Sequence, residues 1–251
     1  MVRKSLFLSV VICLFLLTCP VNAGMLIGSG AVGGDYCDGK LGSYEFYWDA
    51  DHTSGDLFAC ISGGTKEGTQ NGGTISDTQD HTTGSGESFY FDDPSKYISW
   101  AISSGDVWNS SEGYILLWVY YTLDGTNVTV FWDVEYDSNN FQHISADGSE
   151  RVRFYHYSSA AGSADGFCQT DTNAITIDSW NKIEAWWDST GDNIYLEVND
   201  TAQASDSTAT CTFSNEPTAI RVGTVGVIDM ERHEPFIDDV YVETTFPGAP
   251  F

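Results

Sequence analysis

Residues 179–200 read SWNKIEAWWDSTGDNIYLEVND, and no other stretch of the chain predicts its local structure as clearly. Side chains along 180–188 and again along 194–200 change face at every residue if these segments are β-strands. The five residues between them, STGDN, contain a glycine and suit a longer hairpin loop. We therefore expect a β-hairpin, with Glu184 and Trp186 sharing one face of its first strand.

The rest of the chain carries the same kind of signal at regular spacing. Helical periodicity is nearly absent, and short runs of β-branched and aromatic residues are separated by Gly, Asn, Asp and Ser. The run YILLWVYYTL at 114–123 is almost continuously apolar, which indicates a central strand buried on both faces. The pattern predicts an all-β fold of two antiparallel sheets, a jelly-roll β-sandwich. The other main strands expected are 43–49, 87–91, 96–102, 128–136, 141–146, 151–157, 207–213, 219–225 and 236–243.

The first residues indicate export. Residues 1–23 combine a basic start with an apolar run and a small-residue cleavage site, which is the pattern of a secretory signal peptide. The apolar run is too short for a membrane span, and no later segment is long and apolar enough. A lipid anchor at Cys19 fits poorly, because Leu17-Thr18 precedes it. We expect residues 24–251 to be secreted as a single β-sandwich domain without a transmembrane segment.

The chain is strongly acidic. It has 36 Asp and Glu against 10 Lys and Arg, and its formal net charge is −26 at pH 7. Such a surface repels nucleic acid and anionic membranes, so neither is an expected partner. It suits a protein that stays soluble outside the cell, with a glycan or an extracellular protein as its partner.

Four cysteines follow the predicted cleavage site: Cys37, Cys60, Cys168 and Cys211. An even number in an exported chain indicates two disulfides, for which the sequence allows three connectivities. We favour the local pairs Cys37–Cys60 and Cys168–Cys211, each expected to stabilise the fold by roughly 3 kcal/mol. Buried thiols are the alternative.

Several landmarks follow one another along the chain: SFYFDDPSKYI at 88–98, the strand of Trp118, the hairpin at 179–200 and FIDDVYVE at 236–243. This order resembles the laminin G-like and concanavalin A-like jelly-roll superfamily. The resemblance departs at Asn199-Asp200-Thr201, which lacks the glycine typical of that place. It implies two antiparallel sheets that often bind sugars or proteins, sometimes with a structural calcium. Some relatives are glycoside hydrolases or polysaccharide lyases.

The last expected strand carries a candidate calcium site. In 236–243, strict alternation puts Asp238 on the same face as Val240 and Val242, so core-facing valines would bury a carboxylate. A buried charge needs hydrogen-bond donors or a metal, and calcium with oxygen ligands suits an exported acidic chain. The segment also resembles the end of carbohydrate-binding jelly rolls attached to xylanases and glucanases, which implies Glu45 as a second ligand. Backbone N–H groups around Asp238, without a metal, are the alternative.

The strand FWDVEYD at 131–137 carries a candidate catalytic pair. Asp133 and Glu135 share one face, at a spacing that suits the two carboxyl groups of an inverting glycosidase. Jelly-roll glucanases have a Glu-x-Asp-x-Glu motif on such a strand, and here Asp133 and Asp137 stand where those enzymes have Glu. No neighbour in the sequence obviously raises the pKa of either carboxyl group. A solvated strand face is the favoured interpretation.

The same strands suit binding without catalysis. An aromatic and polar platform is expected from Phe131, Asp133, Glu135, Arg153, Tyr155 and Trp186. Aromatic rings stack on the C–H faces of sugars, while carboxylates and arginines bind hydroxyl groups. We predict a secreted, non-catalytic module that binds a carbohydrate or a protein partner. The alternatives are a glycoside hydrolase using Asp133 and Glu135, and a structural surface or matrix protein in which these rings only pack.

Overall fold

The computed structural model describes residues 46–48, 57–61, 64–72, 74–76, 88–91, 96–102, 107–122, 128–137, 140–158, 166–207, 217–223 and 235–245. All of them belong to one compact unit, Gly33–Phe251. The predicted signal peptide and Glu45 lie outside the described residues. Among the residues described, no helix is long and apolar enough to span a membrane.

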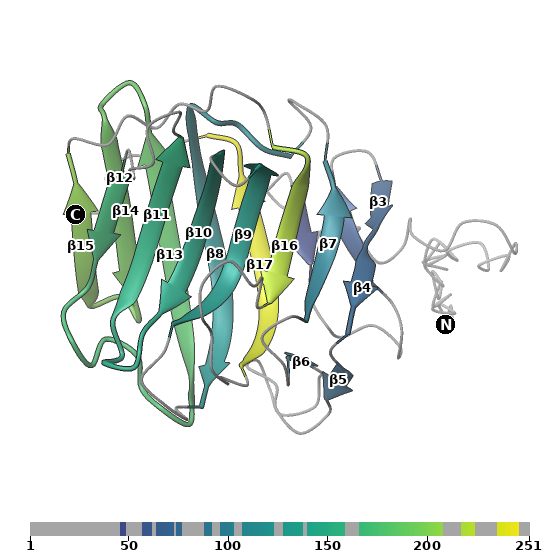
Figure 1. The fold of residues 1–251 in the computed structure, drawn as a ribbon, viewed down its shortest axis with the longest axis horizontal. Coiled ribbons are helices and arrows are strands. Elements are labelled where there is room, and N and C mark those ends of the chain that lie inside the picture. Colours follow the sequence, from purple (N-terminus) through teal and green to yellow (C-terminus); the bar gives the residue numbers. More distant parts are fainter. Residues whose placement is uncertain are drawn as a thin grey trace, which may run out of the picture. The chain divides into compact units, whose positions relative to one another are not determined.

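The described residues form two sheets, here called sheet A and sheet B (Figure 1). Sheet A contains β1 (Phe46–Trp48), β2 (Phe58–Ile61), β3 (Gly64–Glu67), β5 (Thr74–Ser76), β6 (Ser88–Tyr90), β8 (Glu112–Tyr121), β13 (Ser179–Asp188), β14 (Asn193–Val198), β15 (Ala202–Asp206) and β17 (Phe236–Glu243). Sheet B contains β4 (Thr69–Asn71), β7 (Tyr97–Ala101), β9 (Thr129–Asp137), β10 (Asn140–Ala146), β11 (Val152–Ser158), β12 (Gly166–Gln169) and β16 (Ala219–Gly223).

Neighbouring strands in both sheets run antiparallel. The order in sheet A is β15-β14-β13-β8-β17-β1-β2-β3, with β6 also paired to β17 and β5 to β6. The order in sheet B is β12-β11-β10-β9-β16-β7-β4. Strands that are distant in the sequence are therefore neighbours in space, as β9 and β16 are.

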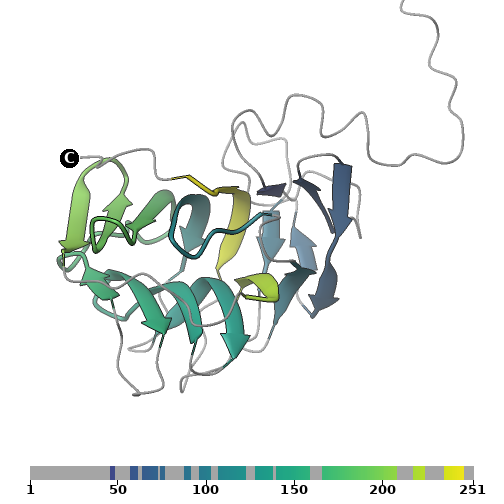
Figure 2. The ribbon, with the colours of Figure 1, turned by 90° about the horizontal axis from the view of Figure 1, so that it is seen from above.

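The two sheets lie against each other as two layers (Figure 2). Aromatic rings join them: Trp187 of sheet A contacts Phe154 of sheet B at a centroid distance of 6.3 Å. Trp108 stacks on Trp187 at 4.5 Å and also contacts Trp132 of β9 at 5.6 Å. These side chains are buried in one continuous hydrophobic core. The predicted all-β sandwich of two antiparallel sheets is confirmed.

The hairpin predicted from the sequence is formed by β13 and β14. Its loop has four residues rather than five, because Asn193 pairs with Asp188 and so belongs to the strand. Trp187 is fully buried in the core, and its indole N–H donates to the carbonyl oxygen of Asn109 at 2.9 Å. Opposite it on β8 stands Gly113, where a Cβ would lie 2.2 Å from Cζ2 of Trp187. Only glycine therefore leaves room for the ring.

The turn after β14 uses Asn199 and Asp200 where a glycine was expected. Both have positive φ, 53° and 55°, and the amide of Thr201 donates to the carbonyl oxygen of Val198 at 3.1 Å. These features fit a type I′ hairpin turn, in which Asn and Asp tolerate the left-handed conformation. The side-chain oxygen of Asn199 accepts from the amide of Lys182 at 3.0 Å, which fixes the turn to β13. The missing glycine therefore does not disrupt the hairpin.

Strand β8 lies between β13 and β17 in sheet A. The prediction that both of its faces are buried is wrong. Leu117 and Val119 are fully buried in the core, whereas Leu116 and Trp118 are only half-buried. The apolar run therefore supplies the core with one face. Its other face contributes to the outward face of sheet A, meaning the face turned away from the core.

Cys60 on β2 and Cys168 on β12 are both buried. Cys37 and Cys211, the partners predicted for them, lie outside the described residues. Both disulfide pairings therefore stay predictions.

Candidate ligand-binding face

The structure divides the predicted binding platform between the two sheets. Asp133 lies on β9 and Arg153 and Tyr155 on β11, all in sheet B, whereas Trp186 lies on β13 in sheet A. Glu135 pairs through its backbone with both neighbouring strands of sheet B, and its side chain is outside the described part of the chain. A single platform that includes all these side chains is therefore not formed.

A bulge in β9 explains the position of Phe131. The pairing with β10 shifts between Trp132 and Val130, which makes Phe131 the extra residue. Phe131 is fully buried in the core and contacts Tyr121 edge-on at a centroid distance of 5.8 Å. Strict alternation would have placed it on the same face as Asp133. The prediction that Phe131 belongs to an outward platform is wrong.

Five rings run across β10, β11 and β12 on the outward face of sheet B, and we call them the aromatic ladder: Phe141, His143, Tyr155, Tyr157 and Phe167. His143 pairs with Tyr155 and Tyr155 with Phe167, so their side chains share one face. Centroid distances are 4.6 Å for Tyr155–Phe167, 4.6 Å for His143–Tyr155, 5.3 Å for Phe141–His143 and 4.8 Å for Phe141–Tyr157. Phe167 is 38% exposed.

Asp133 and Arg221 continue this face beyond His143. In the strand register Asp133 lies between His143 on β10 and Arg221 on β16. Nη1 of Arg221 is 3.4 Å from Oδ2 of Asp133, and its guanidinium lies over the ring of Tyr97 at 5.6 Å. Asp133 is only 5% exposed, and burial raises its pKa to about 7 although Arg221 lowers it. This carboxyl group therefore changes charge near neutral pH.

His143 lies in the ladder as a neutral imidazole. Burial lowers the pKa of His143 to about 3, and the positive charge of Arg153 acts in the same direction. The side chain is 7% exposed, and its Nε2 has no hydrogen-bond partner among the described residues. Its place becomes visible only when the register puts it between Tyr155 and Asp133.

The turn between β10 and β11 fixes Arg153 beside the ladder. Nη2 of Arg153 donates to Oδ2 of Asp147 at 2.5 Å, and Nε donates to Oε1 of Gln169 at 2.8 Å. Nε of Arg151 donates to the same Asp147 oxygen at 2.8 Å, and the amide of Ser149 donates to Oδ1 at 2.9 Å. Burial would raise the pKa of Asp147, but these hydrogen bonds together hold it below its usual range. Both arginines are therefore engaged by one carboxylate.

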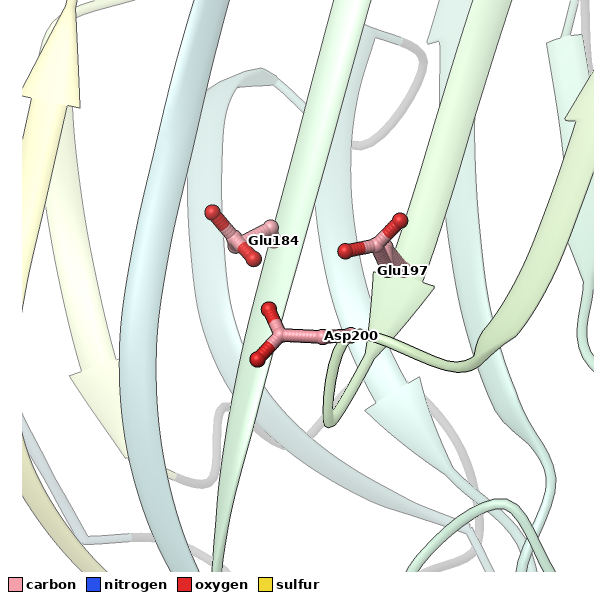
Figure 3. A group of neighbouring side chains, drawn as sticks. All are labelled: Glu184, Glu197 and Asp200. Atoms are coloured by element: carbon pink, nitrogen blue, oxygen red, sulfur yellow. The ribbon is translucent and has the colours of Figure 1, made fainter. Parts of the chain in front are cut away.

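The outward face of sheet A carries a carboxylate cluster that the sequence did not predict: Glu184, Glu197 and Asp200 (Figure 3). Glu184 and Glu197 are cross-strand partners on β13 and β14, Asp200 stands in the next turn, and their oxygens lie within 4.8 Å of one another. Nζ of Lys182 is 2.7 Å from Oε2 of Glu184 and also pairs with Asp200. The hydroxyl of Tyr114 donates to Oε1 of Glu184 at 2.7 Å. The trio offers oxygen ligands of the kind calcium takes, but Lys182 already supplies a positive charge there.

Trp186 lies on the same outward face of sheet A. Its ring is 5.2 Å from that of Tyr114, measured between centroids, and only 5% of the residue is exposed. Trp186 therefore packs on its neighbours. Its predicted contact with a ligand stays a prediction, and it concerns a different sheet from the aromatic ladder.

A bulge in β17 corrects the predicted environment of Asp238. The pairing with β8 shifts between Asp238 and Tyr241, and Asp239 has a φ of +44°. Asp238 pairs with Trp118 on the outward face, while Val240 packs in the core, so the two do not share a face. Asp238 is nevertheless buried, and its Oδ1 accepts from the amide of Asp239 at 2.9 Å. Its role as a calcium ligand with Glu45 stays a prediction.

Sequence comparison finds neither a matching protein-family model nor a matching curated protein. The fold is similar to solved binding domains of botulinum neurotoxins. For the receptor-binding domain of the C/D mosaic serotype, the TM-score is 0.63 at 12% identity over 83% of this chain and 49% of that chain. For the serotype D binding domain, the TM-score is 0.62 at 10% identity over 82% of this chain and 49% of that chain. For the serotype G binding domain, the TM-score is 0.59 at 14% identity over 82% of this chain and 48% of that chain. The chain spans about half the length of these domains, and identities this low show a shared fold alone.

Proposed function

We propose that this chain is a secreted, non-catalytic β-sandwich module that binds a saccharide on the aromatic ladder of sheet B. The observation that carries the proposal is the ladder itself, five contacting rings on the face turned away from the core. Aromatic rings present an apolar surface to sugar C–H groups, and tyrosines add a polar tip.

Two further observations support a binding module of the laminin G-like or concanavalin A-like type. The order of sequence landmarks resembles that superfamily, and the two-sheet sandwich is the architecture that the resemblance implies. The neurotoxin domains with a similar fold are named as receptor-binding domains, which supports a binding role for the architecture. A protein partner is the other ligand class, and the glycan test below distinguishes it.

The test is a glycan array probed with the mature chain, followed by calorimetric titration of each glycan that binds. Truncating a ring at the centre of a binding surface commonly weakens binding by tenfold or more, which is about 1.4 kcal/mol. We expect this loss for Tyr155→Ala. Tyr195→Ala is the matched control, because Tyr195 is a half-buried tyrosine on the outward face of sheet A. Absence of glycan binding, or equal losses in the two variants, would overturn the proposal.

A glycoside hydrolase is the second candidate, and the environment of Asp133 favours it. Burial raises the pKa of Asp133 to about 7, which is the range of a general acid at neutral pH. Glu135 is the predicted second carboxylate. Release of reducing ends from a bound glycan, abolished in Asp133→Asn, would establish this activity. Release at the background rate leaves the module non-catalytic.

We also propose a structural calcium at Asp238. A buried carboxylate needs compensation, and Asp238 is 2% exposed beside Asp239, which is 8% exposed. The hydroxyl of Tyr47 donates to Oδ1 of Asp239 at 2.6 Å, so a side chain of β1 contacts the bulge. Chelation with EDTA is expected to lower the melting temperature, and calcium is expected to restore it. An unchanged melting temperature would sink the calcium proposal without affecting the saccharide proposal.

A further inference from the structure

Phe167 is the most exposed ring of the aromatic ladder. The residue is 38% exposed, and no other large hydrophobic residue in the described ranges is exposed. It lies on β12, the last strand of sheet B (Figure 1). The next residue, Cys168, is buried in the core, so the alternation of the strand turns Phe167 to the outward face. Tyr155 faces the same way, because it pairs with Phe167 and follows the core residue Phe154.

The orientation of the rings determines which of them can stack on a ligand. Phe141 lies nearly parallel to two neighbours, with interplanar angles of 16° to His143 and 9° to Tyr157. Rings stacked in this way cover one another's faces, so mainly their edges are left for a ligand. Phe167 has Tyr155 as its single ring contact within the described structure, and the two planes are tilted by 39°. Phe167 is therefore the ring of the ladder whose face a sugar can cover.

Polar groups lie beside this ring pair, one step further along the same two strands. Arg153 pairs with Gln169, two residues away from Tyr155 and Phe167, which is about 7 Å along the strands. Nε of Arg153 donates to Oε1 of Gln169 at 2.8 Å, and Nη2 donates to Oδ2 of Asp147 at 2.5 Å. Within the described part of the chain, Nη1 of Arg153 and Nε2 of Gln169 make no hydrogen bond, and neither atom is fully buried. Two N–H donors are thus available beside Phe167.

The edge strand that carries Phe167 is held in place from both sides. The amide of Phe167 donates to Oδ2 of Asp206 at 3.2 Å, and Asp206 belongs to β15 of sheet A. On its other side β12 pairs with β11. Because the strand is already fixed, a ligand does not have to order it, which removes part of the entropic cost of binding.

We infer that Phe167 is the affinity-determining residue of the ladder: one pyranose of the saccharide stacks on Phe167 and Tyr155. Gln169 and Arg153 donate to hydroxyl groups of the same sugar. This inference rests on the proposed function. Stacking requires a sugar face that carries C–H groups, and the two donors require free hydroxyl groups at the edge of that sugar. The ligand class is therefore a saccharide with at least one pyranose whose hydroxyl groups on that edge are unsubstituted.

The experiment titrates the oligosaccharides that bind on the glycan array against the full mature chain and a matched pair of variants. Phe167→Leu and Phe141→Leu each remove one ring of the ladder and keep an apolar side chain. We expect Phe167→Leu to weaken binding by about tenfold or more, and Phe141→Leu to cause a loss at least about threefold smaller. Phe167→Tyr keeps the ring and is expected to stay within about threefold of the wild type.

Two further measurements address the stacked ring and the hydroxyl bonds separately. Sugar C–H protons that lie over an aromatic ring shift upfield in proton NMR spectra. We expect this shift with the wild type and with Phe167→Tyr, and a smaller one with Phe167→Leu. Gln169→Met removes the amide but keeps the length of the side chain, and it should weaken binding about fivefold, as for one lost hydrogen bond.

The outcomes separate this inference from the proposed function. No binding of any oligosaccharide overturns both. Binding that is lost in Tyr155→Ala but retained in Phe167→Leu overturns the inference alone, as does a loss in Phe141→Leu that equals the loss in Phe167→Leu. Unchanged binding in Gln169→Met overturns the assignment of the hydroxyl bonds. Circular dichroism shows whether each variant folds, and Phe236→Leu, at a half-buried position on the outward face of sheet A, replaces Phe141→Leu if that variant does not.

Discussion

Replacing Asp147 by Asn is expected to destabilise the turn that anchors Arg153. The carboxylate accepts from Nε and Nη2 of Arg151 at 2.8 and 2.5 Å and from Nη2 of Arg153 at 2.5 Å. It also accepts from the amides of Ser149 and Arg151 at 2.9 and 3.3 Å. Asparagine keeps the size of the side chain and one acceptor oxygen, but it removes the charge that both guanidinium groups share.

The expected loss in the free energy of unfolding is worked out from Arg153, the more buried of the two arginines. The ion pair of the more exposed Arg151 is screened by solvent, so it is not counted. Arg153 is 19% exposed and Asp147 6%, and a hydrogen bond between charged groups contributes about 1.5–3 kcal/mol when buried. Because Arg153 and Asp147 are still partly exposed, we expect the free energy of unfolding to fall by about 1–2 kcal/mol. This corresponds to a decrease in melting temperature of about 2–8 °C.

The assay is thermal and urea unfolding followed by circular dichroism, at neutral and at acid pH. Hydrogen bonds hold the pKa of Asp147 below its ordinary value, so its contribution is present above about pH 4 and is lost as the pH falls through the folded pKa. The difference between wild type and Asp147→Asn should therefore shrink in acid. Asp171→Asn, at an exposed position, is the control and is expected to change stability by less than about 0.5 kcal/mol. Equal effects of the two substitutions, or a difference that persists undiminished in acid, would refute the reasoning.

Two further predictions concern buried positions. Burial lowers the pKa of His156 from 6.5 to about 3, so the unfolded chain binds a proton that the folded chain excludes. The contribution of His156 to the free energy of unfolding is at its maximum above about pH 6.5, and it falls by about 1.4 kcal/mol per pH unit between that pH and about pH 3. His156→Gln, which still accepts from Gln142, should reduce the pH slope of urea unfolding by that amount, and an unchanged slope would contradict the assignment. Gly113→Ala places a Cβ 2.2 Å from Trp187 and is expected to cost about 1–3 kcal/mol in urea unfolding. Gly191→Ala is its control, because a Cβ in that exposed loop would meet only the movable ends of the Asn193 and Asp188 side chains, at 2.4 and 2.9 Å, and equal losses would contradict the packing explanation.

The hairpin and the two-sheet class were predictable because they depend on local alternation. In β13, every second side chain faces the core, so the period of the sequence places Trp187 inside and Glu184 outside without knowledge of the rest of the chain. The carboxylate cluster was not predictable, because it depends on register. A five-residue loop would have set Glu184 opposite Val198, and only the four-residue loop brings Glu197 opposite Glu184.

The errors about Phe131 and Asp238 both occur at bulges. At Phe131 and at Asp239 the strand has one residue more than the partner strand opposite it. The sequence of a single strand does not show where such a bulge occurs, because the bulge depends on the pairing with the neighbouring strand. The separation of Trp186 from Asp133 has another cause. Each strand shows which of its residues share a face, but the sheet to which it belongs is decided by pairings between distant segments, such as β9 with β16.

The network that stabilises the β10–β11 turn also determines the chemistry of the aromatic ladder. Arg153 is held by Asp147 and Gln169, and its fixed positive charge helps to keep His143 neutral. Arg221, the other arginine on this face, is paired with Asp133. Asp147, whose pKa is lowered, stays ionised at neutral pH and compensates the charge of Arg153 locally rather than leaving it to attract a ligand. Saccharide binding should then depend on ring contacts and hydroxyl bonding, and its affinity should change little with ionic strength.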